Sequence, residues 1–139
     1  MSSKWLLVMM LGVWALPASP ARSEKATHPA PASRIANVTN ESFEKDVLKA
    51  KLPVLVLFWA PWAGPAKALE PTVAAIAQVR SRSLKAVKVN TDTESAIAGR
   101  YGIMSIPTLV LFKGGQVVET LVGVQQKSTV LRKLRPYLK

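Results

Sequence analysis

Few residues in this chain could carry chemistry, and their types exclude most mechanisms. The 139-residue sequence has no cysteine and a single histidine, His28. It therefore offers no thiolate nucleophile, disulfide, iron–sulfur cluster or cysteine–zinc site, and one histidine cannot complete a Ser–His–Asp triad or a multi-histidine metal site. A solvated turn and a helix start explain the neighbouring carboxylates Asp92 and Glu94 better than an acid–base pair does. We expect no metal ion, no cofactor and no small-molecule substrate.

Size and charge indicate the class of protein and its expected partners. With 139 residues, of which 49% are apolar and 19% charged, the chain suits one globular domain with its own core. Its 19 Lys and Arg against 8 Asp and Glu give a formal charge of +11, which attracts acidic surfaces. No aromatic residues interleave with the basic clusters, so nucleic acid is not an expected partner. We expect a protein partner with an acidic face, or a membrane surface reached through the N-terminal segment or the basic C-terminal helix. The basic residues near the C-terminus are Lys127, Arg132, Lys133, Arg135 and Lys139.

The first 34 residues predict a targeting signal and a linker. We expect a secretory signal at residues 1–21. Its typical features are a positive charge near the start at Lys4, an uncharged apolar run over residues 5–16 and small residues up to Ala21. The run is too short for a bilayer core of ~30 Å, and an uncleaved N-terminal anchor is the second alternative. Residues 22–34 are typical of a flexible linker, which leaves residues 35–139 for the domain. The protein is therefore expected to be exported, to the periplasm or another extracytoplasmic compartment.

The pattern of apolar residues predicts an α/β domain with one mixed sheet. The unbroken apolar run at residues 54–59 is typical of a strand covered on both faces. A Gly-Gly corner at residues 114–115 indicates an antiparallel hairpin, whereas the earlier strands connect through helices and should run parallel. The expected strands are residues 35–38, 54–59, 84–90, 108–112 and 116–121. Four helices are expected to cover both faces of the sheet. The first starts near a cap at Thr39 or Asn40, and the second follows the turn at residues 61–65. The third spans residues 93–100, and the last includes residues 130–138.

One segment of this pattern is recognisable. The run FWAPWAGPAK at residues 58–67 resembles the active-site segment of the thioredoxin family, which has the pattern FWAxWCGPCK. Further segments match the family in the same order, and the resemblance covers residues 35–139. It implies the thioredoxin fold, a mixed central sheet of parallel strands and a C-terminal antiparallel hairpin, with helices on both faces. The further matching segments are VKVNTD at 87–92, YGIMSIPT at 101–108, FKGG at 112–115 and VG at 122–123.

The chain departs from the family at the positions that carry its chemistry. Ala63 and Ala66 stand where the family has its two cysteines, and Leu57 stands where it has a buried aspartate that accepts a proton. A methyl group can neither attack a disulfide nor release a mixed disulfide. Two origins explain this: natural loss, or replacement of both cysteines in the laboratory. We favour natural loss, because a knockout would seldom also change the aspartate or keep an export signal.

The resemblance also implies a groove that binds extended peptide beside the active-site turn, with a cis peptide bond before Pro107. Our first hypothesis is therefore a non-catalytic protein-binding module that docks on a partner, joins a complex or holds unfolded segments. The alternative is a thiol–disulfide oxidoreductase whose catalytic cysteines are lost or were changed to alanine. A nucleic-acid accessory role is a third hypothesis, which export disfavours. The implied groove residues are Trp62, Gly64, Pro65, Ile106, Pro107, Val122 and Gly123.

Overall fold

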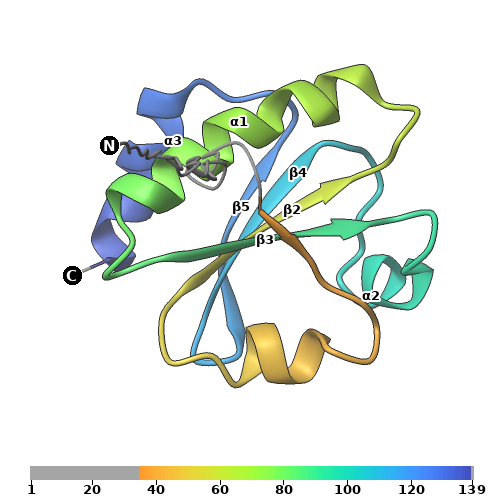
Figure 1. Cartoon of the computed structure of the whole chain (residues 1–139), viewed down its shortest axis with the longest axis horizontal. Coiled ribbons are helices and arrows are strands. Elements are labelled where there is room, and N and C mark those ends of the chain that lie inside the picture. The colour runs from red at the N-terminus through yellow and green to blue at the C-terminus, as the bar shows by residue number, and fades with distance from the viewer. Residues whose placement is uncertain (1–34, 139) are drawn as a thin grey trace, which may run out of the picture.

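A five-stranded mixed sheet forms the centre of the computed structural model, which describes residues 35–138 (Figure 1). Strands β1 (Ala36–Asn37) and β2 (Val54–Trp59) run parallel to β3 (Lys85–Asn90), whereas β4 (Thr108–Lys113) runs antiparallel to β2 and to β5 (Gln116–Val122). This confirms the predicted α/β fold with parallel strands and a final hairpin. The expected signal segment (1–21) and linker (22–34) lie outside the described residues. In spatial order the strands are β1, β3, β2, β4 and β5.

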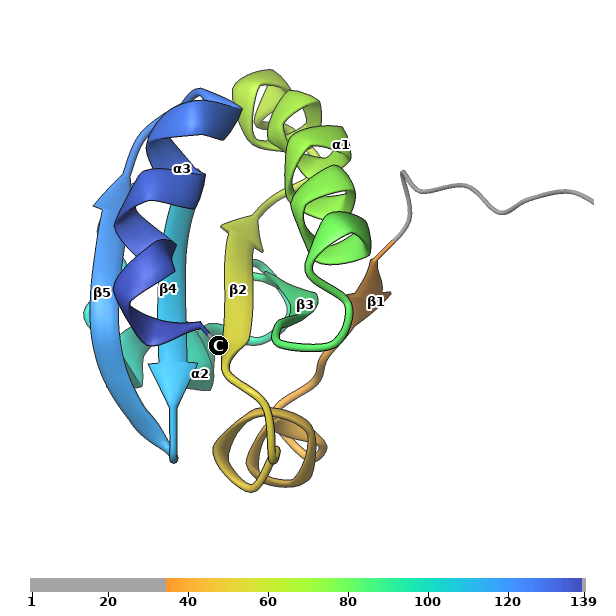
Figure 2. The same cartoon turned by 90° about the vertical axis from the view of Figure 1, so that its left-hand side faces the viewer.

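Helices cover both faces of this sheet, as Figures 1 and 2 show. Helices α1 (Gly64–Val79) and α3 (Lys127–Leu134) pack together on one face. The opposite face is covered by α2 (Ser95–Arg100) and by η2 (Glu44–Leu48), a single π-helical segment where a regular helix was expected. Among residues 35–138, no helix combines the length and the apolar character needed to cross a membrane.

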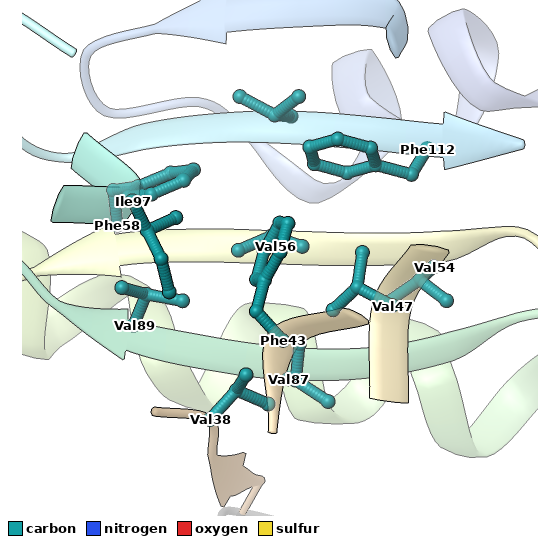
Figure 3. Packing of buried hydrophobic residues seen from close by; sticks show 11 residues of the cluster. Val38, Phe43, Val47, Val54, Val56, Phe58, Val87, Val89, Ile97 and Phe112 are labelled. Atoms are coloured by element: carbon teal, nitrogen blue, oxygen red, sulfur yellow. The ribbon is translucent and has the colours of Figure 1, made fainter. Parts of the chain in front are cut away.

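Strand β2 shows why the sheet forms where the sequence predicts it. Five of its six residues, Val54 to Phe58, are fully buried, because alternate side chains point into hydrophobic clusters on opposite faces. The cluster beneath η2 and α2 includes Val54, Val56 and Phe58, together with Phe43 and Phe112 (Figure 3). The cluster beneath α1 and α3 includes Leu55 and Leu57 with the helix residues Leu69, Val73, Ile76, Val130 and Leu134.

The turns follow from local chemistry. Gly114 and Gly115 both have positive φ, 61° and 82°, which is the conformation that a two-residue hairpin turn requires. At the start of the domain, the hydroxyl of Thr39 accepts the N–H of Ser42 at 3.2 Å in the turn before η2, whereas the N-cap of η2 is Phe43 and not the expected Thr39 or Asn40. Near the C-terminus α3 ends at Leu134, and a 3-10 turn that contains Pro136 follows.

Candidate functional site

The site begins at the amino end of α1, where the chain leaves the carboxyl end of β2. The N–H of Ala63 donates to the carbonyl of Ala60 at 3.1 Å, and this turn places Ala63 as the N-cap of the helix. Pro65 occupies the first turn, where its missing N–H costs nothing. Ala63 is 7% exposed and Ala66 is fully buried, so position 63 lies at the surface edge and position 66 lies one turn inside.

Trp62 stands beside this turn and is 71% exposed. Its indole N–H donates to the carboxylate of Asp92, with distances of 3.1 and 3.3 Å to the two oxygens. The backbone N–H of Asp92 in turn donates to the side chain of Asn90 at 2.9 Å. Asp92 thus orients the tryptophan from an exposed turn.

The second part of the site is the loop before β4. The Ile106–Pro107 peptide bond is cis, as the resemblance implied, and Pro107 is buried. The N–H of Gly123 donates to the carbonyl of Pro107 at 2.8 Å, and Thr108 pairs with Val122 in the hairpin register. The structure therefore brings together the three expected groove residues Pro107, Val122 and Gly123, although they are far apart in sequence.

The two parts share a shallow cavity of about 350 Å³. Trp62 lines it from the α1 side and Ile106 from the loop side. Met104 also lines this cavity and is 93% exposed. The sequence analysis did not single out Met104. The signal that could have identified it is a large apolar residue among the small residues of a loop. Val122 lines a separate hollow, and Gly64 and Pro65 are exposed at the helix start without lining either one.

A half-buried ion pair joins α1 to β3. Nζ of Lys88 is 2.8 Å from Oε2 of Glu70, and the two side chains are only 14% and 19% exposed. Lys88 is the register partner of Leu57, and its Nζ lies 4.8 Å from the ring centre of Trp59. Leu57 itself is fully buried. The family's aspartate is absent at position 57, as the sequence analysis stated, and Glu70 supplies a half-buried carboxylate from the helix.

Glu70 was missed because sequence reasoning treated this helix only as an apolar stripe. The available signal was a charged residue directly after Leu69 and four residues after Ala66, a spacing that places it on the same helix face as position 66. No group of three metal-ligating side chains occurs in the stretch from residue 35 to residue 138.

A cis-proline loop facing the first turn of a helix, on a mixed five-stranded sheet, defines a thioredoxin-fold domain. The profile of the family described as Thioredoxin matches residues 34–136, and the chain belongs to the thioredoxin family. It is 48% identical over 104 residues to "Thioredoxin" of Porphyra purpurea, a match that covers 75% of this chain and 97% of the relative. It is 50% identical over 103 residues to "Thioredoxin 1" of Synechococcus elongatus, covering 74% and 96% of the two chains. It is also 45% identical over 101 residues to "Thioredoxin M-type, chloroplastic" of Chlamydomonas reinhardtii, covering 73% and 72%.

These relatives overturn our first hypothesis about function. The expectation of a non-catalytic binding module as the main function is wrong, because the chain matches proteins named thioredoxin at nearly half identity along almost their whole length. The physical reason for the error is that the hypothesis rested on three side chains, Ala63, Ala66 and Leu57. The remainder of the site, including the helix start and the cis-proline loop, keeps the arrangement on which the alternative depends.

Proposed function

We propose that this domain is the scaffold of a thiol–disulfide oxidoreductase of the thioredoxin family whose two catalytic cysteines, at positions 63 and 66, are lost or were changed to alanine. The observation that carries the proposal is the placement of Ala63 at the N-cap of a 16-residue helix, with Ala66 buried one turn later. This is the geometry that thiol exchange needs, because a nucleophile must meet its substrate at the surface and the resolving group must wait behind it.

The helix start activates a thiol placed at position 63. Its free backbone N–H groups and the helix dipole favour negative charge and so lower the pKa of a thiol there. The thiolate attacks a substrate disulfide, forms a mixed disulfide and expels one substrate thiolate. A thiol at position 66 then attacks the sulfur at position 63, which releases the second substrate thiol and leaves a disulfide between the two positions.

The chain with alanine at both positions performs neither step under this proposal. A methyl group has no lone pair with which to attack sulfur, and the sequence offers no other cysteine as a substitute. Under this proposal the chain is redox-inactive because Ala63 and Ala66 carry no thiol. The helix start and the cis-proline loop, which would position the reacting groups, are present.

The substrates would be proteins with accessible disulfides. The exposed Trp62 and Met104 and the half-buried Ile106 line the same cavity and offer an apolar contact for a polypeptide beside the turn. The formal charge of +11 supports substrates with acidic faces, and the apolar segment at residues 5–16 supports an exported protein. These partners and this location remain part of the proposal.

The test is to restore the two thiols. We expect Ala63→Cys with Ala66→Cys to accelerate the reduction of insulin disulfides by dithiothreitol, measured as the onset of turbidity. The unmodified chain should match a blank without protein. A doubly substituted protein that folds, by circular dichroism, and yet matches the blank would contradict the proposal.

Single substitutions separate the two roles. Ala63→Cys alone should form a mixed disulfide with substrate that accumulates, because nothing at position 66 can resolve it. Ala66→Cys alone should react slowly with the same substrate, because position 66 is fully buried. Both adducts are measured by mass spectrometry of the intact protein. Equal trapping by the two variants would contradict the assigned order of attack.

A further inference from the structure

A basic pocket lies at the end of the sheet opposite the candidate site, and the proposed function does not use it. The chain before β2, the chain before β3 and the turn after β4 meet at this end, because β3 runs parallel to β2 and β4 runs antiparallel to it. Figure 2 shows the start of β2 and the end of β4 side by side at the lower edge of the sheet. The cavity between these segments has a volume of about 290 Å³.

Each of the three segments contributes one cation to the lining of this pocket. Lys51, Arg82 and Lys113 are all exposed, and no ion pair within residues 35–138 engages any of them. Within the described chain no carboxylate lines the pocket, and Glu44 on η2 pairs with Lys49 at 3.2 Å instead. An anion placed among the three cations is attracted by all of them, and a phosphate group also suits the planar fork of the arginine.

Exposed apolar side chains accompany these cations. Leu52 lines the pocket and is 36% exposed, and Val79, at the end of α1 just before the turn that contains Arg82, is 66% exposed. Half-buried Tyr137 also lines the pocket. Basic residues mixed with apolar and tyrosine side chains are typical of surfaces that lie at the headgroup level of a bilayer. A pocket for a phosphate in solution does not need the exposed leucine and valine.

The described chain also enters the domain on this side of the sheet. Strand β1 begins at Ala36, which pairs with Val87 in the first half of β3, the half nearer the pocket. The 34 preceding residues contain the uncharged apolar run at residues 5–16, for which an uncleaved anchor is one of the two expectations. A domain that is tethered through this strand meets the membrane with the end that carries the three cations.

We propose that this pocket binds the phosphate of an anionic phospholipid headgroup and that the domain rests on a membrane surface at this end. Arg82 donates to the phosphate oxygens, Lys51 and Lys113 add positive charge, and Leu52 and Val79 enter the interface. The candidate site then faces away from the membrane, because it lies at the other end of α1, about 24 Å from the pocket end at 1.5 Å per residue. The inference uses neither position 63 nor position 66 and is independent of the proposed function.

The first test measures partitioning of the full chain onto lipid vesicles by sedimentation. Vesicles of phosphatidylcholine alone report the contribution of the apolar run, and vesicles that also contain phosphatidylglycerol add headgroup charge. We expect the triple variant Lys51→Gln, Arg82→Gln, Lys113→Gln to partition onto the anionic vesicles roughly 10²-fold less, at about fivefold for each cation near the surface. Its partitioning onto the neutral vesicles should not change.

The matched control removes three exposed cations outside this end of the sheet. Lys67 lies in the first turn of α1, Lys127 begins α3 and Arg100 ends α2. Changing all three to Gln lowers the formal charge from +11 to +8, as the pocket variant does, so that attraction through net charge falls equally. Salt screens charges beyond about 8 Å at physiological ionic strength, so the control should lose less than about fivefold. Equal losses in the two variants, each shown to be folded by circular dichroism, would overturn the proposal.

The second test measures orientation and uses the absence of cysteine, because one introduced thiol then carries the only label. Ser81→Cys places a fluorophore beside Arg82, and Ser128→Cys places one at the start of α3, five residues after Gly123; both serines are exposed. On anionic vesicles the label at position 81 should be shielded from acrylamide quenching, whereas the label at position 128 should be quenched as in solution. Any other pattern would overturn the proposed orientation.

Calorimetric titration with inorganic phosphate distinguishes the two sources of the anion. Saturable phosphate binding by a protein that partitions equally onto neutral and anionic vesicles would assign the pocket to a phosphate in solution and contradict the membrane proposal. Equal partitioning without phosphate binding would contradict it as well. Preference for anionic vesicles that is lost in the pocket variant and kept in the control supports it, whether or not the restored dithiol protein reduces insulin.

Discussion

The two faces of the sheet are built from the same strands and differ in chemistry. The face under η2 and α2 is a hydrocarbon cluster in which Phe43, Tyr101 and Phe112 form three ring contacts with centroids 5.0 to 5.6 Å apart. The face under α1 and α3 has a similar apolar cluster but also contains the Glu70–Lys88 pair. The candidate site adjoins this second face through α1.

The difference shows how a charged side chain is accommodated in a sheet that is covered on both faces. Burying a charge is costly unless the charge is paired. On the α1 face, the charged side chain of Lys88 lies within strand β3 among apolar neighbours. It therefore needs a partner of opposite charge. With leucine at position 57, that partner comes from the helix.

The largest effect on stability is expected on the apolar face. Phe112→Ala should lower the free energy of unfolding by about 3–5 kcal/mol, because it removes a fully buried ring that contacts both Phe43 and Tyr101. Urea denaturation measures the loss. A loss below about 1 kcal/mol would mean that this face is packed less tightly than its buried residues indicate.

A smaller and non-additive loss of stability is expected for substitutions of the ion pair on the α1 face. Glu70→Gln should destabilise the chain by roughly 1–3 kcal/mol, because it leaves the half-buried Lys88 ammonium without its counter-charge. Replacing both members, Glu70→Leu with Lys88→Met, should cost less than either single substitution. Glu119→Gln, which breaks the more exposed pair with Lys133, should cost below ~0.5 kcal/mol. Additive losses in the two-member replacement would contradict a coupled buried pair.

The smallest effect concerns the hairpin that ends the apolar face beside η2. Gly115→Ala should destabilise by about 1–2 kcal/mol, the cost of a side chain in left-handed backbone. Its φ is +82° and a Cβ would lie 3.2 Å from the carbonyl oxygen of Leu48. Gly64→Ala is the matched control, because its Cβ would meet nothing within 4 Å. Thermal unfolding of the two variants checks this, and equal midpoints would contradict it.

Elements fixed by local patterns were predicted well from the sequence. The buried run at residues 54–59 became β2, and the Gly-Gly corner became the hairpin turn. Both depend on a few consecutive residues whose backbone preferences or burial pattern point one way. The cis peptide before Pro107 was expected from the family resemblance alone. The short η2 was predicted only as a helix, because its π-helical form depends on how the segment packs on the sheet.

The polar contacts of the site could not be predicted in this way. Glu70 and Lys88 are separated by 18 residues, and Trp62 and Asp92 by 30. Such pairs form only when a helix and a strand, or two turns, are placed against each other, so no local spacing encodes them. The function was misjudged because three departures, at Ala63, Ala66 and Leu57, were given more weight than the matching segments of the domain, and the relatives show that the match extends over almost their whole length.

The central claim is that the amino end of α1 is built to activate a thiol at position 63, and its most direct test is the reactivity of Ala63→Cys. The rate of alkylation by iodoacetamide is measured against pH, with Thr120→Cys, an exposed position on β5, as the reference. The account predicts that the pKa of the thiol at position 63 lies at or below about 7.5, at least one unit below the reference near about 8.5. Two coinciding titration curves would contradict it.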